Sequence, residues 1–382
     1  MLTNSNIPCR DFAKLHRDVA FGKSGGKIIW QPRIGCWYDD KIFAGEPLPS
    51  PYTDMKLPEI YRELNCSARI YEYYFCFKRI EHPSVKFIER QLNDTDLETK
   101  IVTPAGTQVL ITRKTKSSCH EITVKWQVET EEELKVAVWR EENVSWKWDQ
   151  SKFNEIQNKW GNLGAPTMFI LFPRMNVQSL YIEKMGVENG VMALYDWPDT
   201  VGAYFKAVDE AHDRFIDVIN DSPIEIVNFG ENIHAGTLSP DLFLKYHLPA
   251  CQRRCERLHR ANKFVSSHWD GDTKPILQYA RETGLDGIEA ITPLPQGDVT
   301  LEEIKEGLGD DLFLLDGLPA ILFDSSYPVS MLEDYTYRLI DLFAPKLVLG
   351  ISDELSSTGD IERVRIVGQI VDKYNAAIEA KK

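Results

Sequence analysis

The fold class is decided by residues 224–271, which read IEIVNFGENIHAGTLSPDLFLKYHLPACQRRCERLHRANKFVSSHWDG. Two short apolar runs, Ile224–Asn228 and Phe264–Ser267, enclose a long segment of helical character, Asp241–Ala261. A helix start is predicted at Ser239-Pro240, because a serine hydroxyl caps free amides and proline fits the first helical turn. Apolar runs that alternate with amphipathic segments indicate repeated strand–helix units.

The same alternation continues to the end of the sequence. Further strands are expected at Gly287–Ala290, Leu312–Leu315 and Leu347–Ile351, and further helices at Thr273–Thr283, Leu301–Leu308, Val329–Leu342 and Asp360–Ile378. A (β/α)₈ barrel of the TIM type needs about 250 residues and tolerates insertions. We therefore expect an α/β fold in which residues 1–382 form a single barrel domain.

The first half of the chain is less regular. It predicts strands at Lys27–Ile34 and Met168–Phe172 and helices at Glu131–Glu142, Val177–Met185 and Thr200–Ile219. Between the two strands, Lys100–Thr115 and Glu121–Gln127 alternate polar and apolar residues around Pro104-Ala105-Gly106. This pattern favours an antiparallel hairpin region, at about residues 84–130, appended to a barrel that also carries an N-terminal extension.

Composition limits the classes of partner. The net charge of −14 opposes binding to nucleic acid or to an anionic membrane surface. The sequence has no apolar stretch of about 18 residues and no signal-peptide core at its start, so we expect a cytoplasmic protein. For the oligomeric state, we expect a monomer or a homodimer. The i,i+4 pair Cys251 and Cys255 is expected to pack in the interior, with metal binding as the minor alternative.

An acid or a histidine stands at or just past the end of each of the five C-terminal runs. In a parallel barrel these ends share one mouth, where functional groups gather. Any single acid could instead cap the next helix, but the full set favours a common site. The candidate catalytic residues are Glu231, His268, Asp270, Glu289 and Asp316.

The segment His268-Trp269-Asp270-Gly271 is the most specific element of this set. A histidine that closes a strand, followed by an acid, suits metal coordination or an acid that orients an imidazole. The alternative is that His268 bonds to a loop and Asp270 caps the helix from Thr273. A site with so many carboxylates needs a cation, shared protons, or hydroxyl and amine donors from a substrate. We favour a divalent metal, zinc first, on His268, Asp270, Glu231 and Asp353.

Several motifs together resemble the uroporphyrinogen decarboxylase superfamily. They are EIVNFGEN at 225–232, the Ser239-Pro240 helix with Tyr246 and Leu248-Pro249, SHWDG at 267–271, TGLDGIE at 283–289, Leu315-Asp316-Gly317 and Thr103-Pro104-Ala105-Gly106-Thr107. The resemblance implies a TIM-type barrel with its pocket at the strand C-termini. It also implies one of two chemistries: decarboxylation of a porphyrinogen without a cofactor, or zinc-dependent methyl transfer to or from a corrinoid protein.

The residues favour the second chemistry. The decarboxylases of the family carry an arginine-rich N-terminal stretch that clamps the substrate carboxylates, whereas the stretch 31–38 here holds one arginine, Arg33, followed by Asp39 and Asp40. The methyltransferases that make thioethers carry cysteines at Asp270 and near Asp353. Without those thiolates the site suits an oxygen or nitrogen donor.

The sequence therefore predicts a corrinoid-dependent methyltransferase. It would move a methyl group from a methoxylated or methylated small molecule, possibly a methoxylated aromatic, to a corrinoid carried by a partner protein. A bound zinc ion, or a proton shared among the acids, would activate this donor. A decarboxylase and a barrel that only binds a ligand remain the alternatives. The candidate substrate-binding residues are Arg33, Trp37, Tyr38, Asn232, His234, Trp269 and Tyr327.

Overall fold

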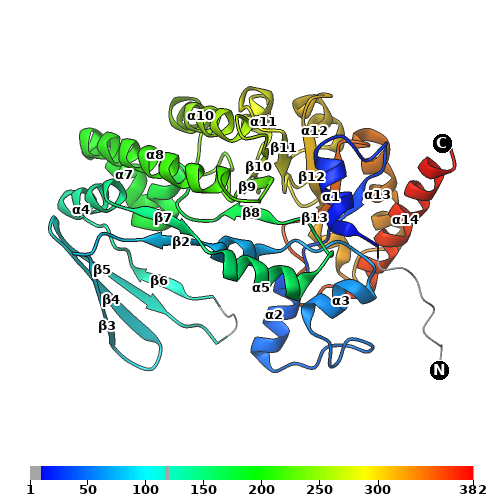
Figure 1. The fold of residues 1–382 in the computed structure, drawn as a ribbon, viewed down its shortest axis with the longest axis horizontal. Helices are drawn as coiled ribbons and strands as arrows, with labels where there is room; N and C mark the ends of the chain where they lie inside the picture. Colours follow the sequence, from blue (N-terminus) through cyan, green and yellow to red (C-terminus); the bar gives the residue numbers. More distant parts are fainter. Residues whose placement is uncertain (1–9, 117–119, 382) are drawn as a thin grey trace.

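The computed structural model describes residues 10–116 and 120–381, and its centre is a curled parallel sheet (Figure 1). The strands follow the order β1-β13-β12-β11-β10-β9-β8, and every neighbouring pair is parallel. Their bounds are Ile29–Trp30 (β1), Thr167–Ile170 (β8), Ile226–Phe229 (β9), Phe264–His268 (β10), Gly287–Glu289 (β11), Phe313–Pro319 (β12) and Leu347–Ser352 (β13). The predicted barrel architecture is confirmed, with seven regular strands among the described residues.

An irregular segment, residues 66–70, fills the space between the two edge strands β1 and β8. The amide of Ser67 donates to the carbonyl of Trp30 (3.0 Å), and the amide of Ala68 donates to the carbonyl of Leu163 (2.8 Å). A Cβ atom at Gly164 would lie 2.2 Å from the Ala68 oxygen, so only glycine allows this approach. The eighth position of the barrel is thus held by a segment that forms no regular strand.

Helices surround the outside of the sheet (Figure 1). In the C-terminal half they are α8 (Pro198–Asn220), α10 (Leu248–His259), α12 (Leu301–Leu308), α13 (Val329–Phe343) and α14 (Ile361–Glu379). The buried residues of α8 include Tyr204, Val208, Ala211, Phe215 and Ile219, whose spacing of three or four places them on one face. All six residues of β13 are buried, so the core lies between the sheet and these helix faces.

Three predicted helices differ from the structure. The segment expected at 177–185 lies mostly in the π-helix η2 (Ser179–Met185), which follows α6 (Asn176–Gln178). The segment expected at 241–261 consists of α9 (Pro240–Leu242), the π-helix η3 (Phe243–His247) and α10, and the segment expected at 273–283 holds only α11 (Lys274–Leu277) and the 3₁₀-helix η4 (Ala280–Glu282). The remaining elements are α1 (Phe12–Ala20), α2 (Gly35–Ala44), α3 (Leu57–Glu63), η1 (Tyr71–Cys76), β2 (Phe77–Ile80), α4 (Glu131–Glu142), β7 (Ser145–Trp148), α5 (Gln150–Trp160), α7 (Val187–Asp196) and η5 (Ala320–Phe323).

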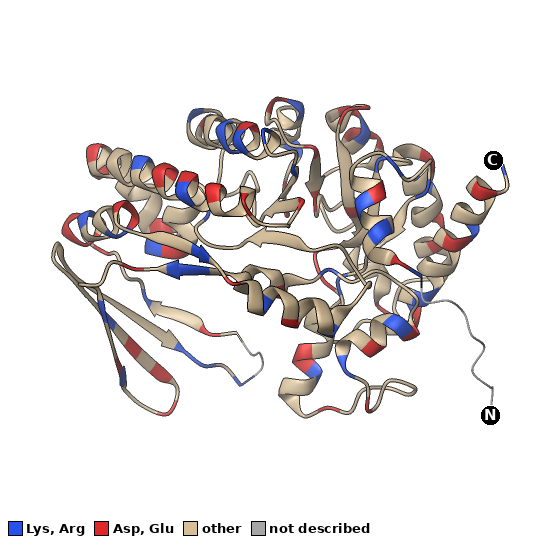
Figure 2. Ribbon diagram, in the orientation of Figure 1, with Lys and Arg blue, Asp and Glu red and all other residues tan. Residues whose placement is uncertain are grey.

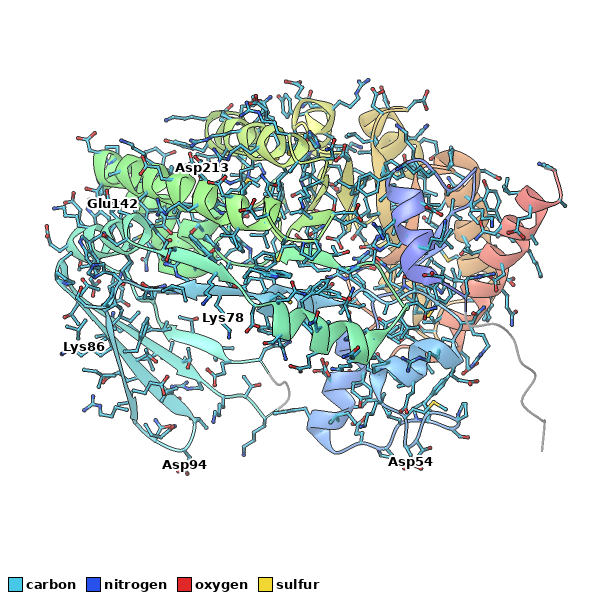
Figure 3. The ribbon with its side chains drawn as sticks, viewed as in Figure 1. Asp54, Lys78, Lys86, Asp94, Glu142 and Asp213 are labelled. Atoms are coloured by element: carbon cyan, nitrogen blue, oxygen red, sulfur yellow. The ribbon has the colours of Figure 1, made fainter. Side chains whose placement is uncertain are left out.

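The appended region is a four-stranded antiparallel sheet rather than a single hairpin. Its order is β3-β4-β5-β6, with bounds Lys86–Gln91, Asp96–Thr103, Gly106–Arg113 and Ile122–Lys125. Strand β3, which the sequence analysis missed, is exposed along its whole length, so it lacks the alternation of buried and exposed residues that identifies a strand. The sheet extends away from the barrel, and the labelled Lys86 and Asp94 mark the β3 side of it (Figure 3).

Charged residues lie mainly on the outer helices, and the strands of the barrel are mostly uncharged (Figure 2). Acidic and basic residues are interspersed along these helices (Figure 2). Within the described residues, no helix combines the length and the apolar character needed to cross a bilayer.

Candidate functional site

A small cavity of about 70 Å³ lies at the C-terminal ends of the barrel strands. Four residues predicted for the site line it: Arg33, Asn232, His268 and Glu289. The other lining residues are Tyr71, Phe169, Leu171, Arg174, Asn228 and Gly230. The convergence that the strand ends predict is therefore present for these four side chains.

His268 and Glu289 form a hydrogen-bonded pair in the cavity wall. They end the neighbouring parallel strands β10 and β11 and lie directly opposite each other in the strand register. Nδ1 of His268 is 3.2 Å from Oε2 of Glu289, and both side chains are buried. A carboxylate on one ring nitrogen fixes the proton there and orients the ring, which leaves Nε2 for other partners.

The cation among the carboxylates is a guanidinium, that of Arg69. Its Nη1 contacts Oε1 of Glu289 and lies 3.1 Å from Oδ2 of Asp316, while its Nη2 lies 2.8 Å from Oδ1 of Asp316. All three side chains are buried. Arg69 belongs to the irregular segment 66–70, and sequence reasoning missed it because no predicted strand ends there. A single basic residue in the short segment Cys66-Ser67-Ala68-Arg69-Ile70 was the available signal.

The two carboxylates that share Arg69 differ in their proton affinity. Although burial acts to raise it, Arg69 and His268 hold the pKa of Glu289 well below its usual range. Burial and the neighbouring Glu289 raise the pKa of Asp316 to about 6, against the effect of Arg69. Glu289 is therefore the ionised partner of His268 at neutral pH.

Arg33 extends the network toward the loop after β13. Its Nε donates to Oε1 of Glu354 (3.1 Å), and its Nη1 lies 3.5 Å from Asp353 and 3.8 Å from Asp316. Nη1 itself makes no hydrogen bond among the described residues. Although burial acts to lower it, Tyr71 and the surrounding acids raise the pKa of Arg33, so the group is a permanent cation in the cavity wall.

Glu231 does not line the cavity. Both of its carboxylate oxygens accept the backbone amide of Met175, at 3.0 and 3.1 Å, and the side chain is fully buried. Burial raises the pKa of Glu231 to about 7, although Arg174 opposes this. The side chain is placed to hold the loop after β8 against the loop after β9.

The other predicted residues lie outside the cavity lining. Asp353 has 58% of its side chain exposed, His234 bonds through Nε2 to Thr237, and Asp270 keeps a buried oxygen, Oδ1, with no partner among the described residues. The aromatic residues Trp37, Tyr38, Trp269 and Tyr327 pack in or against the core. The aromatic wall of the cavity is formed by Tyr71 and Phe169, whose ring centroids are 4.6 Å apart.

The expected zinc ligands are not gathered at one point. The described part of the chain contains no group of three or more His, Cys, Asp or Glu side chains arranged to hold a metal ion. His268 is paired with Glu289, Glu231 with an amide, and Asp353 is turned toward solvent. Glu289 and Asp316 share the guanidinium of Arg69, and Glu231 holds a backbone amide, so this donor set does not fit zinc. Cys251 and Cys255 form a buried pair with their Sγ atoms 3.9 Å apart.

Several residues at the mouth adopt left-handed backbone conformations. Asn232, Ala290, Asp316 and Asp353 have φ values of 52°, 68°, 75° and 73°. They stand at or just past the ends of β9, β11 and β13 and within β12. Asparagine and aspartate tolerate this region better than other residues with a Cβ atom. Such conformations turn the chain sharply where the side chains must face the mouth.

Comparison with known proteins finds a similar fold and a family model that matches part of the chain. The family model "Uroporphyrinogen decarboxylase (URO-D)" matches residues 176–306, which include the ends of β9, β10 and β11. No curated protein matches the chain. A solved "methyltransferase from Methanosarcina mazei" has 12% identity and a TM-score of 0.57, over 94% of this chain and 97% of that one. At 12% identity, this likeness shows a similar fold and nothing further.

A second solved structure is a GH18 chitinase, ChiB, from the chitin utilization locus of Flavobacterium johnsoniae. It has 11% identity and a TM-score of 0.33, over 58% of this chain and 81% of that one, and this likeness carries no argument. The match over residues 176–306 confirms the predicted resemblance of this chain to the uroporphyrinogen decarboxylase superfamily.

Proposed function

We propose that this protein is a methyltransferase that removes a methyl group from a small methoxylated or methylated molecule and delivers it to a corrinoid on a partner protein. The observation that supports this best is the small cavity with the His268–Glu289 pair in its wall. A volume of about 70 Å³ suits part of a small molecule and is far too small for a porphyrinogen. The fold and the family are consistent with methyltransferase-like and decarboxylase-like enzymes alike.

In the proposed mechanism His268 acts as the general acid. Glu289 holds the ring through Nδ1, and Nε2 donates a proton to the oxygen or nitrogen that loses its methyl group. The bond between the heteroatom and the methyl carbon breaks as the proton arrives, so the product leaves as a neutral alcohol, phenol or amine. The paired, buried Glu289 stabilises the protonated ring before transfer.

The methyl acceptor would come from outside the chain. The cavity is too small for a corrin ring, so a corrinoid would have to approach the mouth while bound to a partner protein. Its reduced cobalt would supply the nucleophile that takes the methyl group. The residues of this chain would hold the donor in line and supply the proton.

Cobalt methylation followed by absorbance tests the proposal. The protein is mixed with a reduced corrinoid protein and a panel of methoxylated aromatics and methylated amines, and His268→Gln should lower the rate about 10²- to 10⁴-fold. His259→Gln is the matched control, because this histidine lies on α10 and pairs with Asp286, away from the cavity. The same assay in the presence of a chelator shows whether a metal ion takes part in the methyl transfer. No methylation with any donor would refute the proposal.

A decarboxylase acting on a small carboxylic acid is the second candidate. It is favoured by two arginines, Arg33 and Arg174, that line the cavity and could bind a carboxylate. Their positive charges would also offset the acidic residues around the mouth. Release of carbon dioxide without a corrinoid protein would favour this candidate, and ligand binding with neither reaction would favour a binding protein.

A further inference from the structure

Arg174, which sequence reasoning did not single out, is a buried cation without an ion-pair partner. Its Nε donates to the carbonyl oxygen of Gly230 (2.7 Å), whereas Nη1 has no hydrogen-bond partner. Only 8% of the residue is exposed. Among the residues that the structure describes, no carboxylate lies within 4.0 Å of its guanidinium nitrogens.

Two buried acids, Glu183 and Glu231, interact with the charge of Arg174 but form no ion pair with its guanidinium. Burial raises the pKa of both acids, and the charge of Arg174 opposes this rise. Glu183 and Glu231 also accept backbone amides, those of Arg174 and Met175. A buried and unmatched charge is costly to the fold, so its presence at a cavity indicates a ligand that completes it.

Arg33 lines the same cavity as Arg174. Its Nη1 makes no hydrogen bond within the described chain, although it lies 3.5 Å from Asp353 and 3.8 Å from Asp316. The two residues come from opposite edges of the curled sheet, after β1 and after β8. Two arginine residues from distant parts of the chain therefore line one space of about 70 Å³.

We propose that this cavity binds the carboxylate of the substrate, held between the guanidinium groups of Arg33 and Arg174. The inference rests on the proposed methyl transfer and names its substrate class: a methoxylated or N-methylated carboxylic acid. Guanidinium groups bind carboxylates through paired hydrogen bonds, which suits the free donors. Tyr71 and Phe169 would lie beside an aromatic ring attached to that carboxylate.

The charge balance favours a monoanion. The ionised Glu289 lines the same cavity and would repel a second negative charge, as in phosphate. A neutral donor would leave Arg174 unmatched. The volume also suits a single carboxylate group better than several.

Binding to the wild-type protein is the first test, measured by calorimetry without any corrinoid protein. The probes are 4-methoxybenzoate, its neutral analogue 4-methoxybenzamide, and inorganic phosphate. We expect 4-methoxybenzoate to bind about 10- to 100-fold more tightly than the amide, as for hydrogen bonds to a charged group. Equal affinity for the amide, or tighter binding of phosphate, would overturn the proposal.

Variants assign the effect to the two arginines. Arg174→Gln and Arg33→Gln should each weaken 4-methoxybenzoate about 10- to 100-fold and leave the amide unchanged. Arg260→Gln is the control, because that side chain is 70% exposed and pairs with Glu256 on the same helix. Arg174→Gln should keep or raise the melting temperature of the ligand-free protein, since it removes an unmatched charge; a purely structural arginine would lower it. If Arg174→Gln does not fold, two other measurements test the proposal. They are the affinity of Arg174→Lys for 4-methoxybenzoate and the affinities of the wild-type protein for 4-methoxybenzoate and 4-methoxybenzamide.

The two proposals fail separately. Carboxylate binding without methyl transfer to any corrinoid protein would refute the methyltransferase and retain the carboxylate site. Methyl transfer from neutral donors at rates equal to those from carboxylic acids would retain the enzyme and refute the carboxylate site.

Discussion

Arg69 and Asp316 form a two-point ion pair inside the barrel, with Nη2 at 2.8 Å from Oδ1 and Nη1 at 3.1 Å from Oδ2. The pair joins the irregular segment 66–70 to β12, and the same guanidinium contacts Glu289 at the end of β11. One buried cation thus holds two buried acids from neighbouring strands. The pair therefore belongs to the fold as much as to the site.

Arg69→Met should be strongly destabilising, because it leaves two buried carboxylates without their shared partner. We expect the free energy of unfolding at neutral pH to fall by about 3–5 kcal/mol, measured by urea denaturation. Protonation of the acids should make the loss smaller at lower pH. Arg260→Met, at an exposed ion pair, should change stability by about 0.5 kcal/mol or less. If Arg69→Met also changed the free energy of unfolding by only about 0.5 kcal/mol, the Arg69 network would contribute little to stability.

Gly350→Ala tests the same pair from the neighbouring strand. A Cβ atom at residue 350 would lie 2.1 Å from Oδ1 of Asp316 and 3.0 Å from the carbonyl oxygen of Gln31. Asp316 is fully buried, so its carboxylate would have to move off Arg69. We expect destabilisation of about 1–3 kcal/mol by the same denaturation assay, as for overpacking. Gly202→Ala is the control, because nothing lies within 4 Å of its added Cβ; equal effects at both positions would contradict the steric account.

The strands could be predicted because their signal is local. β10, β11 and β13 begin at the predicted residues Phe264, Gly287 and Leu347, since short apolar runs between helices carry the pattern of buried parallel strands. The segment 66–70 has no such run, and its position depends on neighbours that are distant in sequence. It was therefore missed, together with the arginine that it carries.

The site could be predicted only in part, for a related reason. The strand ends place His268 and Glu289 together, as expected. The counterion of the acids, however, is 220 residues away from Glu289 in sequence, and a local pattern does not distinguish a guanidinium from a metal ion. Glu231 shows the same limit, because its partner is a backbone amide at residue 175.

Glu231→Gln should change the dependence of stability on pH. The pKa of Glu231 is about 7 in the fold and 4.5 in its usual state, so the folded protein binds the extra proton. The contribution to stability is full below pH 4.5 and is lost as the pH rises through about 7. The amide has no proton to lose, so the variant should gain on the order of 3 kcal/mol over wild type at high pH and little at low pH. Urea denaturation across this pH range measures it; an equal change at both ends would contradict the assigned pKa.

Glu289→Gln tests whether the pair with His268 supports proton donation in the proposed reaction. Removing the carboxylate beside Nδ1 takes away the group that orients the ring and offsets its positive charge, so kcat should fall about 10- to 100-fold. Asp316→Asn is the matched control, because it removes the other acid on Arg69 and leaves the His268–Glu289 hydrogen bond in place. It should lower stability with a much smaller effect on kcat. If both variants lower kcat equally, or neither lowers it, His268 does not donate the proton through its pair with Glu289.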